Sequence, residues 1–479
     1  MELPQDFKER MKSQLGDSYA EFIAVYEKER VCGLRYNPLK IDVSKLKSLL
    51  LKQGITLAQT SWAEEGFYYP TDTQPGKLAL HEAGAYYIQE PSAMTAAALL
   101  DPKPGEKILD LCAAPGGKST QIAGRMLGRG LLVSNETVSQ RAKILSRNIE
   151  RMGIANAVVL NETPEHLAEY FPHFFDRILA DAPCSGEGMF RKDENARGEW
   201  SLENTLLCAR RQRDILAQAV RMLRPGGILV YSTCTFAPVE NEETVQWLLQ
   251  EYPELMLESS GHIWPHLDRG EGHYTARFRM EGVDLKCENT NAEAADIVEI
   301  LVKKQKKYSQ GNKKRMQESG PGAEAVMKMK MQMFAQFCEE TLAEKTAAWI
   351  LNEIQIHTKL RFGRLAAFGD QLYILPEGIY SLEGLKTERA GLQLGCCRKN
   401  RFEPSHALAM ALRPQDVKHT VELEDPARYI RGETISCSGQ KGWVLMTVEG
   451  CSIGWGKASA GIIKNHYPKG LRREWQKVR

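Results

Sequence analysis

The spacing of apolar residues along the chain changes twice between its two ends. Near the N-terminus, Phe7, Met11, Leu15, Phe22 and Tyr26 recur at helical intervals. Short extended segments interrupted by proline and glycine follow, in GLRYNPLKID and GFYYPTDTQPGKLAL. This order predicts a small α+β unit over residues 1–90.

From residue 91 onward, apolar runs typical of strands alternate with amphipathic runs typical of helices. KILDLCAAPGGKSTQIAGRML has the order strand, glycine turn and helix, and that order recurs as far as RPGGILVYSTCT. Regular alternation favours a parallel sheet with helices on both faces. We therefore predict a Rossmann-like α/β core over residues 91–285, with its ligand site outside the carboxyl ends of the strands.

The pattern changes again after the predicted core. Residues 302–316 carry seven Lys or Arg and no acid, so we interpret residues 286–330 as a basic linker. Residues 331–479 begin with a helical stretch and continue as short strands separated by glycines, which indicates a compact β-rich module. Because this module is remote in sequence from the core, we expect its deletion to leave ligand binding in the core intact.

Composition narrows the classes of function. The chain has 479 residues, too many for one core, and no apolar run near the roughly 18 residues that span a bilayer. It lacks the pattern of a signal peptide, so we expect a cytoplasmic protein without membrane contact. The eleven cysteines include no C-x-x-C pair, which argues against a disulfide framework or a zinc finger, and we expect no metal. A formal charge of +2 means that nucleic-acid binding would depend on local basic patches.

The turn after the first core strand has the composition of a ligand-binding loop. It follows Asp110, and its small residues allow the backbone to approach a ligand at the start of a helix. Glu136 ends the second strand, where an acid can accept both hydroxyls of a ribose. Since G-x-G-x-x-G and a P-loop are absent, an adenosine-bearing ligand other than NAD fits better, and S-adenosylmethionine is the candidate. The predicted contacts are Cys112, Ala113, Ala114, Pro115, Gly116, Gly117, Lys118, Glu136 and Asp181. The alternative is a plain turn with a solvated Glu136.

Two cysteines end two predicted strands, Cys184 in DAPCSG and Cys234 in STCT. A cysteine at a strand end is more often a core residue than a nucleophile. Asp181 lies beside Cys184, however, and a carboxylate buried there without a ligand would be an unpaired charge. The acidic run that follows Cys234, from Glu240 to Glu243, is predicted to cap the next helix, because acids favour a helix N-terminus.

Several motifs together resemble the RNA 5-methylcytosine methyltransferases of the Nop/Sun family, and within it the bacterial enzymes of small-subunit ribosomal RNA. They are DLCAAPGGKST, DAPCSGEGMFRKD, YSTCTFAPVENEE and GEGHY, and the resemblance extends from LRYNPLK to KNHYPKGLRR. It implies a class I methyltransferase core with an N-terminal RNA-binding domain and a C-terminal PUA-like RNA-binding module. It also implies methyl transfer from S-adenosylmethionine to carbon 5 of cytidine in small-subunit ribosomal RNA.

The resemblance assigns roles to the candidate residues. It implies that Cys234 attacks carbon 6, that Cys184 assists release and that Asp181 acts at ring nitrogen 3, while Lys118 could tune a thiol or orient the base. The family carries an acid after the third strand that touches adenine. Here Asn161 ends that strand and Thr163 takes the aligned place, and we favour Asn161 for the contact.

Three alternatives remain open at this stage. One is a DNA-type mechanism, in which the thiol of the Pro-Cys loop attacks. The second is methylation of transfer RNA cytidine, and the third is a non-catalytic ribosome-assembly factor that keeps the fold.

The expected partner is ribosomal RNA or the small ribosomal subunit, bound by a monomer. Phosphate contacts need exposed basic side chains, and bases of RNA stack on aromatic side chains. The predicted RNA contacts are Arg35, Lys40, Arg191, Lys192, Lys464, His466, Tyr467, Lys469, Arg472, Arg473, Trp475, Lys477 and Arg479.

Overall fold

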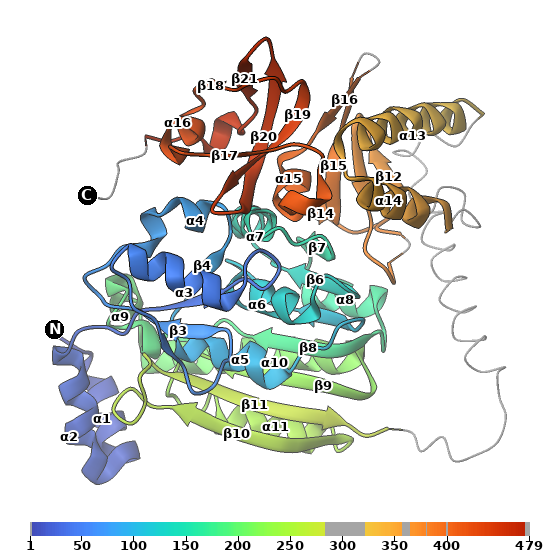
Figure 1. Ribbon diagram of the computed structural model, residues 1–479. Coiled ribbons are helices and arrows are strands. Elements are labelled where there is room, and N and C mark those ends of the chain that lie inside the picture. The colour runs from blue at the N-terminus through green and yellow to red at the C-terminus, as the bar shows by residue number, and fades with distance from the viewer. Residues whose placement is uncertain (1, 283–320, 357–364, 380, 399–400, 475–479) are drawn as a thin grey trace.

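A computed structural model describes residues 2–282, 321–356, 365–379, 381–398 and 401–474 (Figure 1). The basic run at 302–316 lies outside these residues, as do Trp475, Lys477 and Arg479. A central α/β core carries the N-terminal elements on one side and the C-terminal region at one end. Within the described ranges, no helix has the length and apolar character needed to cross a membrane.

The N-terminal elements form two separate structures. Helices α1 (Gln5–Leu15) and α2 (Tyr19–Ala24) bury Phe7 and Phe22 against Phe190 and Phe236 of the core rather than against their own sheet. The sheet has the order β2-β3-β1-β4. Its elements are β1 (Gly33–Tyr36), α3 (Val43–Lys52), β2 (Ala58–Gln59), β3 (Gly66–Tyr68), α4 (Ala79–Glu82) and β4 (Tyr86–Ile88).

The core contains the predicted parallel sheet, in which β5 to β9 run parallel. Its strands are β5 (Lys107–Asp110), β6 (Leu131–Asn135), β7 (Ala157–Leu160), β8 (Phe175–Asp181) and β9 (Leu223–Thr233). Its helices are α5 (Thr95–Leu100), α6 (Gly117–Met126), α7 (Ser139–Arg151), α8 (Pro164–Tyr170), α9 (Glu194–Gly198), α10 (Leu202–Met222) and α11 (Glu242–Glu251).

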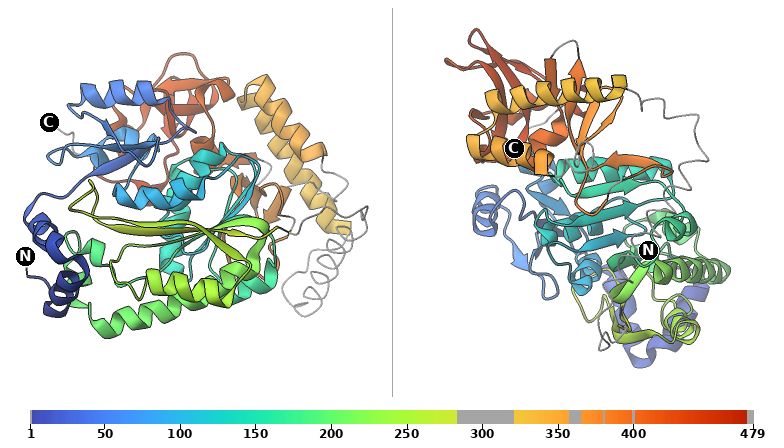
Figure 2. Two further views of the ribbon diagram at one scale, coloured as in Figure 1. Left: turned by 90° about the horizontal axis from the view of Figure 1, so that it is seen from below. Right: turned by 90° about the vertical axis from the view of Figure 1, so that its right-hand side faces the viewer.

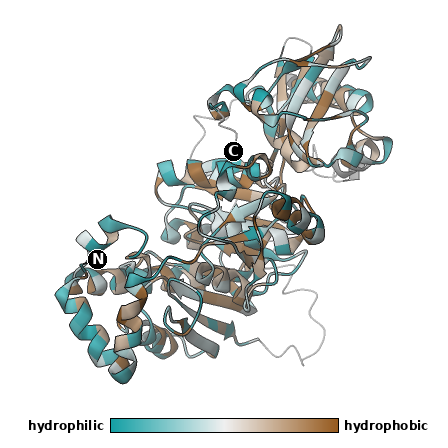
Figure 3. Ribbon diagram, turned by 60° about the vertical axis from the view of Figure 1, so that its left-hand side comes forward, coloured by the Kyte–Doolittle hydropathy of each residue, from teal (hydrophilic) through white to brown (hydrophobic). Residues whose placement is uncertain are grey.

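Side chains alternate between the two faces of this sheet. Ile108 and Leu132 pack into one apolar cluster, and their neighbours Leu109 and Val133 pack into another on the opposite face. The strands of the core appear in brown and pale colours, whereas the helices near the N-terminus are largely hydrophilic teal (Figure 3). The fold prediction of an α/β core is therefore confirmed.

Antiparallel strands extend the sheet at both edges, so that its full order is β10-β11-β9-β8-β5-β6-β7-β14. β10 (Leu255–Ile263) and β11 (His273–Met280) follow the core in sequence. β14 (Thr387–Ala390) comes from the C-terminal region and pairs with β7, with Thr387 opposite Leu160 and Ala390 opposite Val158. The C-terminal region thus completes the core sheet, which the sequence pattern did not predict.

The rest of the C-terminal region is a helical pair followed by two β-sheets, β12-β13-β15-β16 and β17-β19-β20-β21-β18. Figure 2 shows it seated over the end of the core that carries β7. Its helices are α13 (Pro321–Thr341), α14 (Glu344–Ile356), α15 (His406–Ala411) and α16 (Pro426–Arg431). Its strands are β12 (Leu365–Phe368), β13 (Gln371–Ile374), β15 (Leu392–Arg398), β16 (Arg401–Pro404), β17 (Thr420–Glu422), β18 (Ile435–Ser436), β19 (Gly442–Val448), β20 (Cys451–Ser459) and β21 (Ile462–Asn465).

Buried contacts join the C-terminal region to the other two parts; we call these contacts the docking interface. Glu150 on α7 binds Arg389 and His406, and Lys40 donates to Oγ of Ser452 at 2.7 Å. The N-terminal sheet also shares an apolar cluster with Tyr429 and neighbouring residues of this region. The C-terminal region is therefore packed as part of one structure rather than as a separate module.

Candidate active site

The carboxyl edge of the parallel strands gathers the residues that the sequence singled out. Asp110 ends β5, Glu136 follows β6, Asn161 follows β7, Asp181 ends β8 and Cys234 follows β9. The carboxyl ends of parallel strands share one edge, and turns and helix starts come together there. Residues separated by more than a hundred positions therefore lie around one site.

The two predicted thiols are in contact. The Sγ atoms of Cys184 and Cys234 lie 3.3 Å apart, both cysteines are half-buried, and both are free thiols. The hydrogen bond with Cys234, together with burial and the nearby charge of Glu240, raises the pKa of Cys184 well above its usual value. Cys184 is therefore a protonated thiol next to the sulfur of Cys234.

A half-buried ion pair lies beside the thiols. Nζ of Lys118 is 2.7 Å from Oδ2 of Asp181, and Oγ of Ser232 donates to Oδ1 of Asp181 at 2.8 Å. Burial alone would raise the pKa of Asp181, but its interactions with Lys118, His273 and Ser232 together outweigh burial and hold that pKa below its usual value. Burial likewise opposes the charge on Lys118, but Asp181 raises the pKa of Lys118. Both members of the pair are ionised.

His273, to which the sequence analysis assigned no role, lies behind this pair. It is 2% exposed at the start of β11, and its Nε2 is 3.7 Å from Oδ1 of Asp181. Burial, followed by the charge of Lys118, lowers the pKa of His273 to about 3, so the imidazole is neutral. The GEGHY motif was the available signal, but its histidine could be placed only by the pairing of β11 with β9.

The acidic run after Cys234 is only partly what the sequence predicted. Glu242 and Glu243 do lie in the first turn of α11. The prediction that Glu240 caps this helix is wrong, because its side chain is fully buried and accepts hydrogen bonds from Ser185 and Gln212. Asn241 is also fully buried, and its side chain bonds to Thr233 and Thr235.

The predicted ligand loop is held in place by its neighbours. Gly116 has φ +114°, a conformation that favours glycine, and a Cβ there would lie 3.1 Å from Cδ1 of Leu145. The carbonyl of Ala114 accepts from Arg141 at 3.0 Å, and that of Pro115 accepts from Asn148 at 2.8 Å. The N–H of Ala113 donates to the carbonyl of Asn135, and Gly117 begins α6. Burial raises the pKa of Cys112, which is therefore a neutral thiol.

Three carboxylates surround this loop. Glu136 is 4% exposed, which excludes the alternative of a solvated side chain, and its Oε2 is 3.1 Å from Nη1 of Arg141. Asp110 is fully buried and accepts from Oγ of Ser119 at 2.6 Å, while its Oδ1 has no hydrogen-bond partner among the described residues. Burial raises the pKa of Asp110 to about 7. Together with Asp181, these acids suit a ligand that carries positive charge and a diol.

The two candidates for an adenine contact are engaged in local structure. Nδ2 of Asn161 donates to the carbonyls of Glu136 and Thr137 at 2.7 and 2.9 Å, which leaves its Oδ1 for a ligand. Thr163 caps α8 by accepting from the N–H of His166. The backbone of Lys386, next to β14, bonds both to the N–H of Asn161 and to Oε1 of Glu162. The C-terminal region is remote from this pocket in sequence, but it therefore contacts the strand end that borders the pocket.

Several predicted RNA contacts are buried instead. Arg35 is 1% exposed and donates to Gln89, Thr120 and the carbonyl of Gly117. Lys40 lies in the docking interface. The Arg191 side chain is 5% exposed, donates to the carbonyls of Lys28 and Glu29 and is 3.4 Å from Glu271. These three predictions are wrong, because the charges hold the structure together, whereas Lys192 is exposed.

The predicted basic–aromatic cluster near the C-terminus is divided. Tyr467 is buried, Arg472 donates to its carbonyl, and Arg473 pairs with Glu82 of the N-terminal part. Lys464 and Lys469 are exposed, and the His466 ring packs against Trp443. The side of β20 and β21 that carries Lys464 also carries Lys457, which lies over the Trp443 ring.

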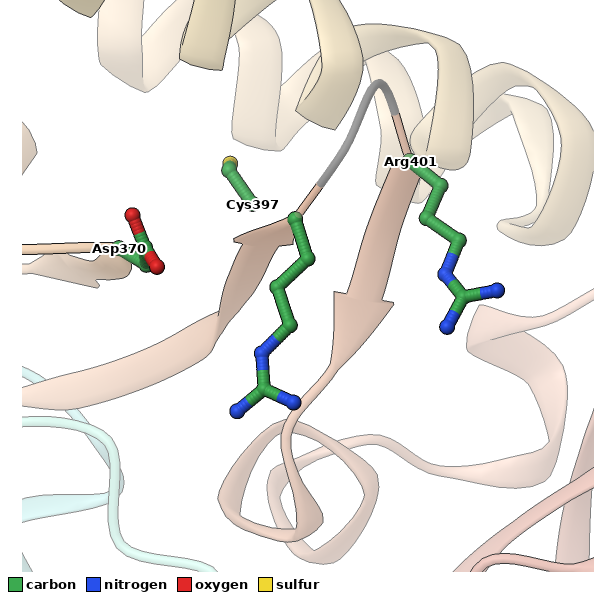
Figure 4. A pocket seen from close by; sticks show the side chains of 4 residues that line it. Asp370, Cys397 and Arg401 are labelled. Carbon is green, nitrogen blue, oxygen red and sulfur yellow. The ribbon is translucent and has the colours of Figure 1, made fainter.

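A hollow lies away from the carboxyl edge, at the end of the β15–β16 hairpin (Figure 4). It has a volume of about 800 Å³, and its described lining is Asp370, Cys397, Arg398 and Arg401. Figure 4 shows Cys397 turned toward the helices and Arg401 extending away from it. Sγ of Cys397 lies 4.0 Å from the carbonyl of Lys330 on α13, and Arg401 pairs with Glu403. The hollow therefore shares no residue with the thiol site.

Four family models match the chain in order. They are the N-terminal domain of 16S rRNA methyltransferase RsmF (residues 3–91), 16S rRNA methyltransferase RsmB/F (97–279), the RsmF rRNA methyltransferase first C-terminal domain (336–412) and the methyltransferase RsmF PUA domain (417–473). Ribosomal RNA small subunit methyltransferase F of Vibrio vulnificus is 31% identical over 98% of both chains.

Solved structures resemble the core. A methyltransferase homolog protein from Pyrococcus horikoshii is 29% identical, with a TM-score of 0.53 over 58% of this chain and 95% of its own. NSun6 from the same organism, solved with SFG, is 23% identical with a TM-score of 0.53 over 58% of this chain and 98% of its own, and it supports the fold.

Proposed function

The chain belongs to the 16S rRNA methyltransferase RsmB/F family, and from this premise we propose that it methylates carbon 5 of cytidine in small-subunit ribosomal RNA. The observation that carries the proposal is the contact of two free thiols, 3.3 Å apart, beside an ionised Asp181–Lys118 pair. Methylation at an amine or a hydroxyl needs no pair of thiols. Methylation at carbon 5 needs an attacking thiol, because that carbon is a poor nucleophile until a thiolate adds to carbon 6, and a second thiol beside the first can assist its release.

S-Adenosylmethionine is the proposed cofactor, and it would supply an electrophilic methyl group. Glu136 would accept its ribose hydroxyls, and the turn from Cys112 to Lys118 would bring backbone close to it. The carboxylates of Asp110, Glu136 and Asp181 match its positive charge. Val138 is 48% exposed just after Glu136 and offers an apolar surface, while Oδ1 of Asn161 remains for a polar contact.

In the proposed reaction, Cys234 attacks and Cys184 assists its release. Cys234 loses its thiol proton to solvent, its Sγ bonds to carbon 6 as the thiolate, and the π electrons of the carbon 5–carbon 6 bond become available at carbon 5. After carbon 5 has taken the methyl group, a base removes its proton, the double bond re-forms, and the sulfur–carbon 6 bond breaks. Cys184 is protonated and adjacent, so it can donate a hydrogen bond to the departing thiolate.

The ionised pair recognises the ring of cytosine. The lowered pKa of Asp181 means that its carboxylate holds no proton to give, so it is suited to accept from the exocyclic amine of cytosine. Lys118 carries the protons of the pair and is the donor for ring nitrogen 3. This division refines the expectation that Asp181 alone acts at nitrogen 3.

RNA binding completes the proposal. The target base must leave its stack to reach the thiols, and flanking phosphates then need basic side chains. We assign Lys192 to the target strand, and Lys457, Lys464 and Lys469 on the C-terminal region to the flanking RNA. Residues 1–90 and 331–479 would flank the catalytic core as RNA-binding parts.

Denaturing gel electrophoresis with labelled RNA and S-adenosylmethionine tests the thiol roles. Cys234→Ala should be inactive and form no covalent complex, whereas Cys184→Ala should methylate and then accumulate a protein–RNA adduct. Cys208→Ala, on α10, is the matched control and should behave as the parent protein. A DNA-type mechanism predicts adduct from Cys234→Ala and none from Cys184→Ala. If the protein is a non-catalytic assembly factor, the parent protein should not methylate RNA. If transfer RNA accepts methyl groups better than ribosomal RNA does, transfer RNA is the substrate.

A further inference from the structure

The loop that carries Cys184 is held at both of its flanking peptides. Nε2 of Gln212 donates to the carbonyl of Pro183 at 3.0 Å and to Oε2 of Glu240 at 2.8 Å. The same Oε2 accepts from the N–H of Ser185 at 3.0 Å, and Oε1 accepts from Oγ of Ser185 at 2.5 Å. The residues before and after Cys184 are thus tied, directly or through Gln212, to one carboxyl group.

Asn241, the residue after Glu240, holds the loop that carries Cys234 in the same manner. Oγ1 of Thr233 donates to Oδ1 of Asn241 at 2.7 Å, and Nδ2 of Asn241 donates to the carbonyl of Thr235 at 3.0 Å. Asn241 therefore spans Cys234 from the residue before it to the residue after it. The hydroxyls of Ser185 and Thr235 lie 2.8 Å apart and connect the two loops.

These supports are deeply buried and do not touch the sulfur atoms by hydrogen bonds. Glu240, Asn241, Gln212, Thr233 and Thr235 are fully buried, and Ser185 is 6% exposed. A carboxyl group is expensive to bury, and apolar side chains of similar size usually stabilise a core as well or better. The buried carboxyl of Glu240 therefore indicates that the two cysteine loops must be held in fixed positions, because such hydrogen bonds define the positions of the loops more narrowly than apolar packing does.

We propose that Glu240 and Asn241 are positioning residues that set the distance between the two thiols, Glu240 by holding the Cys184 loop and Asn241 by holding the Cys234 loop. The inference rests on the proposed function for its chemical consequences but not for its geometry. Loss of Glu240 displaces the thiol that assists release, and loss of Asn241 displaces the thiol that attacks. Two adjacent substitutions therefore have opposite chemical effects, which a general structural role would not produce.

The first measurement is the adduct assay with Glu240→Ala and Asn241→Ala, beside Cys184→Ala and Cys234→Ala as references. Glu240→Ala should lower turnover about 100-fold and accumulate adduct, as Cys184→Ala does. Asn241→Ala should lower turnover by a similar factor without accumulating adduct. Glu243→Ala, an exposed residue of the same acidic run, is the matched control and should leave both readouts unchanged.

The second measurement tests the geometry without RNA or cofactor. Diamide oxidises two adjacent thiols to a disulfide, taking up the two electrons and two protons that the thiols release, and peptide mass mapping detects the Cys184–Cys234 link. The folded parent protein and Glu243→Ala should form it rapidly, and Glu240→Ala and Asn241→Ala at least about 10-fold more slowly. Glu240→Gln, which keeps the shape and part of the hydrogen bonding, should be intermediate and guards against a misfolded alanine variant.

The outcomes separate the two proposals. If the cysteine references fail to show opposite phenotypes, the proposed function fails, and the cross-linking rates still decide the positioning roles. Folded Glu240 and Asn241 variants that cross-link at the parent rate would overturn the inference. The inference would also be overturned if the cysteine references behave as expected but the Glu240 and Asn241 variants both accumulate adduct, or neither does.

Discussion

The carboxyl edge of the core sheet and the docking interface both bury charged side chains, but the two regions differ in whether those side chains have hydrogen-bond partners. In the docking interface, the carboxylate of Glu150 is satisfied by Arg389 and His406, and both ring nitrogens of His406 have partners. At the edge, Oδ1 of Asp110 and Nε2 of His273 have no hydrogen-bond partner within the described part of the chain. Buried polar groups without partners are rare in folded proteins, and they are tolerated where a ligand or a reaction needs them.

The pKa values of carboxyl groups in the two regions also differ. At the edge, burial raises the pKa of Asp110 and of Glu240 to about 7. In the docking interface, burial of Glu150 also opposes its charge, but His406 and Arg389 outweigh it and lower the pKa of Glu150 to about 2. The charge of Glu150 therefore stabilises the docking interface. At the edge, ionisation of Asp110 or Glu240 at neutral pH destabilises the fold, but it leaves acids there that can serve a ligand or a reaction.

Deletion of residues 331–479 should have the largest effect, because it removes β14 and every partner of Glu150 across the interface. We expect a loss of several kcal/mol in the free energy of unfolding and loss of measurable cofactor binding. Thermal unfolding and calorimetric titration would measure both. Addition of residues 331–479 as a separate chain should restore part of each. A truncated protein with unchanged cofactor affinity would contradict the interpretation of the interface.

Lys118→Met should leave the half-buried Asp181 carboxylate without its cation. We expect methyl transfer to fall about 1,000-fold and the free energy of unfolding to fall by about 3 kcal/mol, the range seen when a buried pair loses one member. Single-turnover kinetics and urea unfolding would measure these losses. Lys143→Met, an exposed lysine on α7, is the control. Equal loss in both variants would point to a general effect of lysine removal.

Glu150→Gln tests the stabilising charge of the docking interface. In the parent protein, the folded-state pKa of Glu150 is lowered. Its contribution to the free energy of unfolding is therefore present above pH 4.5 and is lost as the pH falls toward 2. We expect the variant to be about 2 kcal/mol less stable at pH 7, with the difference narrowing below about pH 4.5. Urea midpoints measured from pH 7 down to about pH 3 check this, with the exposed Glu165→Gln as control. A difference that widens on acidification would reverse the assignment.

Glu240→Gln should show the opposite pH dependence. Because the folded pKa of Glu240 is raised to about 7, the parent protein loses stability as the pH rises from 4.5 through 7. Relative to the parent, the variant should therefore gain about 1–2 kcal/mol between pH 5 and pH 8, even though its activity falls. The measurement is the same urea series. A constant difference across this range would show that Glu240 does not titrate in it.

Glu136→Ala should have the smallest effect and should be confined to cofactor binding. Removal of one acceptor for the ribose is expected to weaken affinity about tenfold, or ~1.4 kcal/mol. Calorimetric titration with S-adenosylmethionine or its demethylated product checks this, with the exposed Glu169→Ala as control. Undiminished affinity would remove Glu136 from the pocket.

The sequence by itself determined the core and the place of its site. Alternating strands and helices dictate a parallel sheet, and parallel strands bring their carboxyl ends to one edge, so Asp110, Glu136, Asp181, Cys184 and Cys234 had to converge. Their motifs are local, each within a few residues of a strand end. The 3.3 Å contact of the two sulfurs is not local, and only the fold brings them together.

Tertiary structure alone decided the roles of several charged residues. Glu240 has the sequence context of a helix cap, and Arg35, Lys40 and Arg191 have that of phosphate contacts, but all four side chains bond to partners far away in the chain. The four residues of β14 carry no strand pattern strong enough to stand out, and the strand forms because β7 offers an unpaired edge. Whether a charge is exposed or buried depends on which distant surfaces meet around it, and that information is absent from any local segment.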